Sequence, residues 1–163
     1  MELTVRRAEN RDIPKLLELL VQVDMVHHSG RPDIFKGPAT KYNAQELETI
    51  IAYDKTPVFV CADGKGEVLG HAFCIHRQFT DDPVMTDIKT LYIDDICVDE
   101  KFRGRHVGKA LYEHVRDYAL LIGCNNMTLN VWEGNLPAES FYRNMGMKVQ
   151  KTTMEIRLPQ PEK

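Results

Sequence analysis

The segment from Leu91 to Ile122 constrains the fold of this chain more than any other. It opens with the apolar run LYIDDICV, which predicts a strand over Leu91–Val98, and continues through a turn rich in glycine and arginine. Apolar residues then recur at helical spacing up to Ile122, and Gly123 follows at a suitable C-cap position. We therefore expect an α/β-type fold, and a length of 163 residues corresponds to one domain.

The turn between this strand and this helix has the chemistry of an anion site. It contains Arg103, Gly104, Arg105 and Gly108, with Lys109 directly after them. The first N–H groups of a helix have no partner within the helix, and glycines let a ligand approach them closely. Three cations at the same place add positive charge, so a phosphate or pyrophosphate is the expected guest. The alternative is a solvated, charged turn before a surface helix.

Two common nucleotide-binding motifs do not match this turn. A P-loop needs four residues between its glycines and a hydroxyl residue after the lysine. Here only three residues separate Gly104 from Gly108, and Ala110 stands where the hydroxyl residue would be. The dinucleotide fingerprint GxGxxG is also absent.

The remaining elements follow from periodicity and turn signals. The predicted order is β-α-α-β-β-β-α-β-α-β, without an internal repeat. A loop is expected from His27 to Tyr42, and Asn43 with Glu46 resembles a capping box that opens the second helix. The other predicted elements are a strand at Leu3–Arg7, a helix capped by Asn10 or Asp12, strands at Val58–Ala62, Glu67–Phe79 and Met127–Val131, a short helix at Pro137–Met145, and one or two strands within Met147–Leu158.

Composition argues against several classes of protein. The chain has 21 Lys and Arg against 24 Asp and Glu, and this acidic balance disfavours a dedicated nucleic-acid binder. No apolar run approaches the roughly 20 residues of a membrane span, and the opening MELTVRRAEN has no signal-peptide core. Four cysteines without CxxC spacing predict reduced thiols in a cytoplasmic protein. Six scattered histidines give no metal-ligand pattern, so no metal is expected.

A second constellation, NVWEGNLPAESFYRNMG, follows the strand near residue 130. Asn135 can cap the short helix that follows it, and that helix carries Tyr142. Taken alone, Tyr142 is better explained as a packing or surface residue than as part of a site. A strand, (R/Q)xxGx(G/A) and a helix, followed some 30 residues later by a strand and NxxAxxFY, resemble the GNAT superfamily of acetyl-CoA-dependent N-acetyltransferases. The resemblance covers nearly the whole chain.

The resemblance implies a fold and a cofactor site. The fold would be a single α/β (α+β) GNAT domain over residues 1–158 with a short tail at 159–163. Its mixed central sheet would have about six or seven strands, flanked by about four helices, with the fourth and fifth strands splayed apart. Acetyl-CoA would lie against residues that correspond to the family's cofactor contacts: Ile96, Cys97 and Val98 beside the pantetheine, Arg103, Gly104, Arg105, His106, Val107, Gly108 and Lys109 around the pyrophosphate, and Asn135.

His106 departs from the family pattern, which usually has glycine at this position. Its side chain must point away from the pyrophosphate or touch it, and an imidazole near phosphate would make a pH-dependent contact.

Tyr142 aligns with the tyrosine that many family members use as the general acid toward the leaving thiolate.

The general base is less clearly indicated. Asn130 stands where some relatives have an acidic residue, and an amide cannot accept the proton. Asp94 and Asp95 lie on the preceding strand, and strand alternation predicts that they point to opposite faces. Asp94 aligns better with the acidic position that meets amines, so it is the first candidate for the base or for an amine contact, and Asp95 the second.

The loop after the first helix is where this family builds the wall that contacts the acceptor. The candidate contacts are His27, His28, Arg31, Asp33 and Phe35, with loop packing as the alternative.

The resemblance implies transfer of acetyl to the primary amine of a small molecule, an antibiotic-like compound or a protein, by direct attack in a ternary complex. A non-catalytic acyl-CoA-binding module is the alternative. Neither nucleic acid nor membrane is expected as a partner, and the family allows a homodimer.

Overall fold

The computed structural model describes residues 1–162, and contacts between residues separate the chain into two compact units. The first unit, residues 1–130, contains all the strands and three of the four α-helices, and the second unit begins at Val131. The single domain predicted over residues 1–158 therefore stays a prediction. Among the described residues, no helix is long and apolar enough to cross a membrane.

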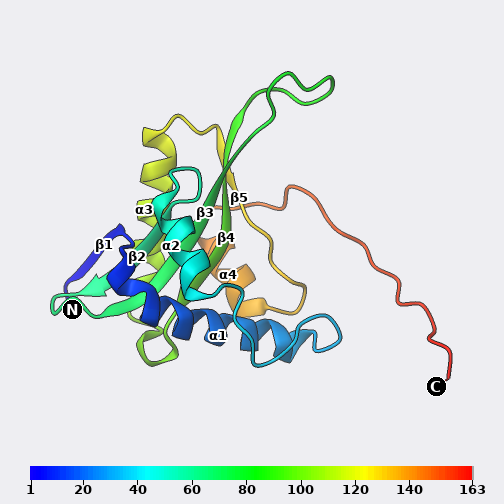
Figure 1. Cartoon of the computed structure of the whole chain (residues 1–163). Helices are drawn as coiled ribbons and strands as arrows, with labels where there is room; N and C mark the ends of the chain where they lie inside the picture. Colours follow the sequence, from blue (N-terminus) through cyan, green and yellow to red (C-terminus); the bar gives the residue numbers. More distant parts are fainter. Residues whose placement is uncertain (163) are drawn as a thin grey trace. The chain divides into compact units, whose positions relative to one another are not determined.

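The first unit is built on a five-stranded mixed sheet (Figure 1). Its strands lie in chain order, β1 to β5; the first four pair antiparallel, and β5 pairs parallel to β4. The strands are β1 (Leu3–Arg7), β2 (Val58–Asp63), β3 (Val68–Gln78), β4 (Lys89–Val98) and β5 (Asn126–Thr128).

Helices cover both faces of this sheet, as period-2 alternation along β2 shows. Val58 and Val60 pack in one cluster with α1 (Ile13–Gly30) and α2 (Ala44–Ala52). Phe59 points the other way and makes ring contacts with Tyr118 of α3 (Val107–Leu121) at 5.1 Å between centroids. Figure 1 shows α1 and α2 on one side of the strands and α3 on the other. Two short 3-10 helices, η1 (Asn10–Asp12) and η2 (Glu100–Phe102), precede α1 and α3.

Two irregularities in β4 shape the sheet where the site is expected. The register with β3 shifts between Phe73 and Cys74, which pair with Asp95 and Ile93, so Asp94 is an extra residue in a β-bulge. On its other side, β4 pairs with β5 only from Thr90 to Tyr92. Within the described residues, no strand pairs with this edge of β4 beyond Tyr92.

The second unit contains α4 (Leu136–Asn144), which begins at the predicted cap. The Asn135 side-chain oxygen accepts a hydrogen bond from the Ala138 N–H at 3.4 Å. Residues 147–162 form neither helix nor strand, although Met154, Ile156 and Leu158 alternate in the way that predicts a strand. Alternation alone does not make a strand, because a strand also needs a neighbouring strand to pair with, and among the described residues none pairs with 147–162.

Three predicted features are therefore wrong. The sheet has five strands instead of six or seven, because the final strands do not form. The strand expected at Met127–Val131 is short and ends at Thr128. The first helix continues through His27 and His28 to Gly30, because the Arg31 N–H still donates to the His27 carbonyl at 2.9 Å. The capping box at Asn43, the other strands and the four helices are confirmed.

Gly70 on β3 is required by the close approach of neighbouring elements. A Cβ there would lie 2.7 Å from the Cys97 carbonyl oxygen and 3.1 Å from Val107 Cγ1. We predict that Gly70→Ala lowers the free energy of unfolding by about 1–3 kcal/mol, as overpacked cores do. Chemical denaturation measures this, with Gly30→Ala as the control because a Cβ there meets nothing within 4 Å. Equal stability of both variants would contradict the crowding at Gly70.

Candidate active site

The turn after β4 is anchored by a buried carboxylate. Asp99 has a side chain only 1% exposed, and its Oδ2 accepts a hydrogen bond from Lys15 Nζ of α1 at 2.6 Å. Its Oδ1 accepts from the Lys101 N–H at 3.1 Å, which caps η2. Burial alone would raise the pKa of Asp99, but the bonds from Lys15 and Lys101 hold this pKa below its ordinary value. Asp99 is therefore charged at neutral pH and fixes the start of the turn to α1.

The rest of this turn contains the residues predicted to bind an anion. Gly104 has φ +75°, and His106, the residue before α3, has φ +64° in the left-handed region. That conformation explains why glycine is usual at the position of His106, and its side chain lies exposed. Arg103, Arg105 and Lys109 are exposed around the same helix N-terminus.

The seven residues predicted around the pyrophosphate do not all contribute in the same way. Val107 is 1% exposed, so its side chain packs in the core and cannot contact a ligand. Cys97 is also buried, and its Sγ lies 3.5 Å from the Leu19 carbonyl, so its side chain packs against α1. Elsewhere in the turn, two glycines present their backbone and three basic residues present cationic side chains, which fit a phosphate group: Gly104, Gly108, Arg103, Arg105 and Lys109.

The unpaired edge of β4 leads from this turn to the two aspartates. Ile96, Cys97 and Val98 bond to β3 on one side only. An extended ligand with amide groups can add to such an edge as an extra strand does. Its far end would then lie beside the bulge at Asp94 and Asp95.

Both aspartates act on one ammonium group, that of Lys41 in the loop before α2. Lys41 Nζ donates a short hydrogen bond to Asp94 Oδ2. Burial alone would lower the pKa of Lys41, but the bond to Asp94 raises it, with a further contribution from the charge of Asp95. The expectation that simple alternation separates the two carboxylates is wrong here, because the bulge interrupts the alternation.

Asp95 is the carboxyl whose protonation is most perturbed in this site. Burial raises its pKa to about 7, the charge of Asp94 adds to the effect, and the charge of Lys41 opposes it. A carboxyl with this pKa can hold or release a proton near neutral pH, as a general base must.

The residues predicted for the acceptor wall lie at the end of α1 and just beyond it. The rings of His27 and Phe35 are 4.9 Å apart, and His28 Nδ1 lies 2.7 Å from the Phe35 carbonyl oxygen. Arg31 Nη2 forms an ion pair with Asp33 at 2.7 Å. These side chains hold the loop to the helix, so at least part of their role is structural.

The other predicted site residues have separate local environments. Asn130 donates from Nδ2 to the Tyr92 hydroxyl at 3.1 Å, so its amide is tied to β4. Tyr142, on α4 in the second unit, is partly buried, and its ring packs edge-on to that of Phe141 at 5.1 Å.

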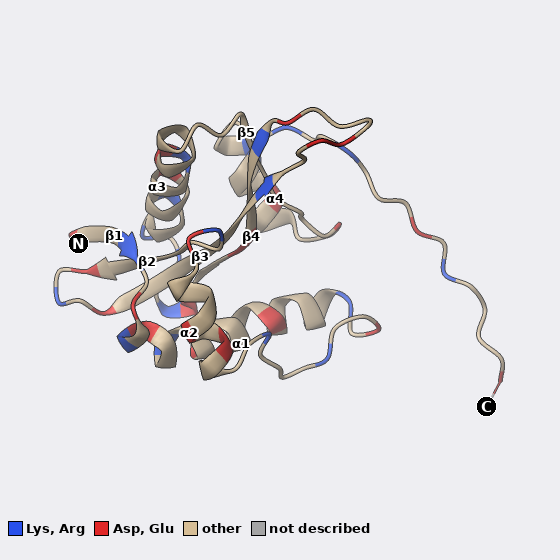
Figure 2. Cartoon of the chain, turned by 45° about the horizontal axis from the view of Figure 1, so that its top comes forward, with Lys and Arg blue, Asp and Glu red and all other residues tan. Residues whose placement is uncertain are grey.

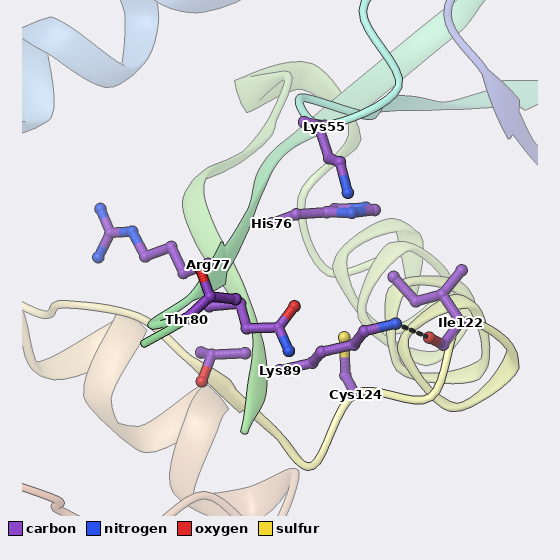
Figure 3. A pocket seen from close by; sticks show the side chains of 9 residues that line it. Lys55, His76, Arg77, Thr80, Lys89, Ile122 and Cys124 are labelled. Atoms are coloured by element: carbon purple, nitrogen blue, oxygen red, sulfur yellow. Dashed lines mark hydrogen bonds between the residues drawn. The ribbon is translucent and has the colours of Figure 1, made fainter. Parts of the chain in front are cut away.

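A separate cavity of about 360 Å³ lies at the opposite end of β4 and contains none of the predicted site residues (Figure 3). Lys55, His76 and Lys89 are among its lining residues. Burial lowers the pKa of His76, and the charges of Lys55 and Lys89 lower it further. Figure 2 shows basic positions where β3 ends and β4 begins, and acidic positions on the loop between them.

Sequence reasoning missed the residues that hold the site in place. Lys41 contacts Asp94, which is 53 positions away in the sequence. Lys15 contacts Asp99, which is 84 positions away. Asp99 gave a weak local signal, as an aspartate placed to cap a short helical turn. No local pattern reveals Lys41. Among the described residues, no group of three His, Cys, Asp or Glu side chains is placed to hold a metal ion.

A family model described as acetyltransferase (GNAT) family matches residues 4–147. The chain belongs to this family. The match spans both units of the structure. A solved structure of a mutant of the BH1408 protein from Bacillus halodurans is 30% identical, with a TM-score of 0.91, and the alignment covers 96% of this chain and 99% of that one.

Two curated relatives have names that include an acceptor. Streptothricin acetyltransferase from Streptomyces lavendulae is 31% identical over 88 residues, which are 54% of this chain and 42% of the relative. Thialysine N-epsilon-acetyltransferase from Sus scrofa is 30% identical over 60 residues, 37% of this chain and 35% of the relative. The chain therefore aligns with less than half the length of each of these relatives.

We predict that Lys41→Met raises the pKa of Asp95 above its value of about 7, because the opposing positive charge is lost while burial and Asp94 remain. Titration of the carboxyl carbons by NMR measures this. Lys36→Met, in an exposed position of the same loop, is the matched control. A pKa of Asp95 that stays the same in both variants would show that Lys41 does not act on it.

Proposed function

We propose that this acetyltransferase moves acetyl from acetyl-CoA to a primary amine by direct attack in a ternary complex. The observation that carries the proposal is the position of Lys41, whose ammonium lies on Asp94 beside the unpaired edge of β4. An amine acceptor needs acidic side chains that hold its ammonium group near the thioester. Asp94 and Asp95 lie at the end of the β4 edge that we propose for the cofactor. The family membership supports the acetyl donor.

The residues present fit acetyl-CoA. The cationic turn from Arg103 to Lys109 would take the pyrophosphate, with the backbone N–H groups that open α3 as donors. The backbone of Ile96–Val98 would bond to the pantetheine, and Asn135 would contact it or orient α4. When bound, the cofactor supplies a thioester that is activated toward attack by an amine.

Asp95 is the residue we propose as general base, ahead of Asp94. Asp94 is engaged by Lys41 and would orient the incoming ammonium, while the raised pKa of Asp95 suits proton acceptance near neutrality. Tyr142 would then give its hydroxyl proton to the departing thiolate. The two steps leave no covalent acyl-enzyme, which agrees with the buried, packed state of Cys97.

The acceptor is proposed only as a class. A cationic primary amine fits the acidic pair, and the loop after α1 with His27, His28, Arg31 and Phe35 would contact the rest of the molecule. Small amines, antibiotic-like amines and protein amines all satisfy this requirement. The acceptors in the names of the two curated relatives, streptothricin and thialysine, support an amine acceptor.

A thiol-release screen with acetyl-CoA against a panel of amines tests this proposal. Release of CoA that depends on one class of amine is expected, together with a rise in melting temperature on adding acetyl-CoA. A rise without any release would favour the alternative, a module that binds acyl-CoA without catalysis. No rise at millimolar acetyl-CoA would overturn both.

We predict that kcat/KM of the wild type falls as the pH is lowered through about 7, because Asp95 becomes protonated and cannot accept a proton. Asp95→Asn should lose activity by about 100-fold or more, and its remaining kcat/KM should no longer fall as the pH is lowered through about 7. Asp94→Asn should raise KM and retain the fall in kcat/KM at low pH. If this fall persists in Asp95→Asn, another residue is the general base.

We predict that Tyr142→Phe retains acetyl-CoA binding and loses turnover by about 100-fold, since only the hydroxyl proton is removed. Thermal shift and thiol release measure the two properties separately. Phe141→Leu, a change at the adjacent ring, is the control for packing of α4. Unchanged turnover in Tyr142→Phe would remove Tyr142 as the acid.

A further inference from the structure

The loop before α2 delivers one of the protein's own amines to the acidic pair. Lys41 comes from the same loop as the proposed acceptor wall. Its Nζ donates a hydrogen bond to Asp94 on β4, which lies 53 positions later in the sequence. Its side chain is 49% exposed and that of Asp94 is 16% exposed. The amine is therefore held at the carboxylates and is still open to an approaching molecule.

Two fixed points hold Lys41 in this position. The Ala39 N–H donates to Asp24 Oδ2 of α1 at 3.0 Å, and the capping box at Asn43 and Glu46 fixes the first turn of α2. Lys41 lies between these two anchors and next to Tyr42, whose ring centroid is 5.4 Å from Nζ. The loop therefore presents Lys41 in one place, which reduces the entropy cost of a reaction there.

The direction of β4 brings the same amine to the reactive end of the cofactor. If the phosphates bind at the turn after β4 and the pantetheine along Val98–Ile96, the thioester would lie beside Asp94, where the ammonium of Lys41 is held. This step rests on the proposed function, because it uses the same donor and the same base.

We propose that Lys41 is a site of self-acetylation. Lys41 Nζ loses a proton to Asp95 and forms a bond to the acetyl carbonyl carbon. The carbon–sulfur bond of the thioester breaks, and the thiolate takes a proton from Tyr142, whose hydroxyl is restored by the second proton that the attacking nitrogen loses. The products are Nε-acetyl-Lys41 and free CoA, so no further reactant is needed.

The modification changes the charge of the site. An acetylated Lys41 carries no positive charge and cannot pair with Asp94, so the Asp94 carboxylate becomes free for the amine of an acceptor. The pKa of Asp95 should then rise, because the charge that opposes its protonation is gone.

Intact-mass measurement and peptide mapping after incubation with acetyl-CoA, without any acceptor, test the proposal. We expect one acetyl group per chain, on Lys41, at a rate that does not depend on protein concentration and exceeds that at Lys36 by more than about tenfold. Lys41→Arg should keep the wild-type melting temperature and gain no acetyl group, because arginine stays protonated. Asp95→Asn should slow the labelling of Lys41 and leave that of Lys36 unchanged.

The result separates this inference from the proposed function. If the amine panel is acetylated and Lys41 stays unmodified, or is labelled no faster than Lys36, self-acetylation is overturned and the proposed function stands. If acetyl-CoA neither raises the melting temperature nor is consumed with any amine, the proposed function falls as well. A second measurement needs no cofactor. The Lys41→Gln variant mimics the neutral product, and titration of its carboxyl groups should show a raised pKa of Asp95.

Discussion

The site depends on how β4 is hydrogen-bonded along its two edges. One edge pairs with β3 over nearly its whole length, whereas the other pairs with β5 only from Thr90 to Tyr92. The first pairing makes β4 rigid, and the second leaves backbone donors and acceptors free beside the bulge. A strand paired fully on both edges would have no place for an extended ligand, and a strand unpaired on both would not hold Asp94 and Asp95 in place.

Much of this arrangement could be predicted from the sequence, because its signals are local. The strand over Leu91–Val98, the basic turn and the amphipathic helix are encoded by neighbouring residues, and the structure has them within two residues of the expected bounds. The capping box at Asn43 was recognisable for the same reason. The final strands failed because strand formation needs a partner, and apolar alternation near Ile156 says nothing about whether one exists.

The electrostatics of the site were not predictable in the same way. Simple alternation placed Asp94 and Asp95 on opposite faces, and a one-residue bulge invalidated this. The pKa of Asp95 follows from burial and from two charges, one of them on Lys41 in a distant loop. Such contacts depend on how the loop before α2 crosses β4, which no local pattern in the sequence specifies.

The ion pair between Lys15 and Asp99 has a consequence for communication within the protein. It attaches the turn after β4 to the first turn of α1, and the last turn of the same helix carries His27 and His28. An α-helix of 18 residues is a stiff rod of about 27 Å. A shift of the turn proposed to bind the phosphates would therefore be carried along α1 to the loop proposed to contact the acceptor.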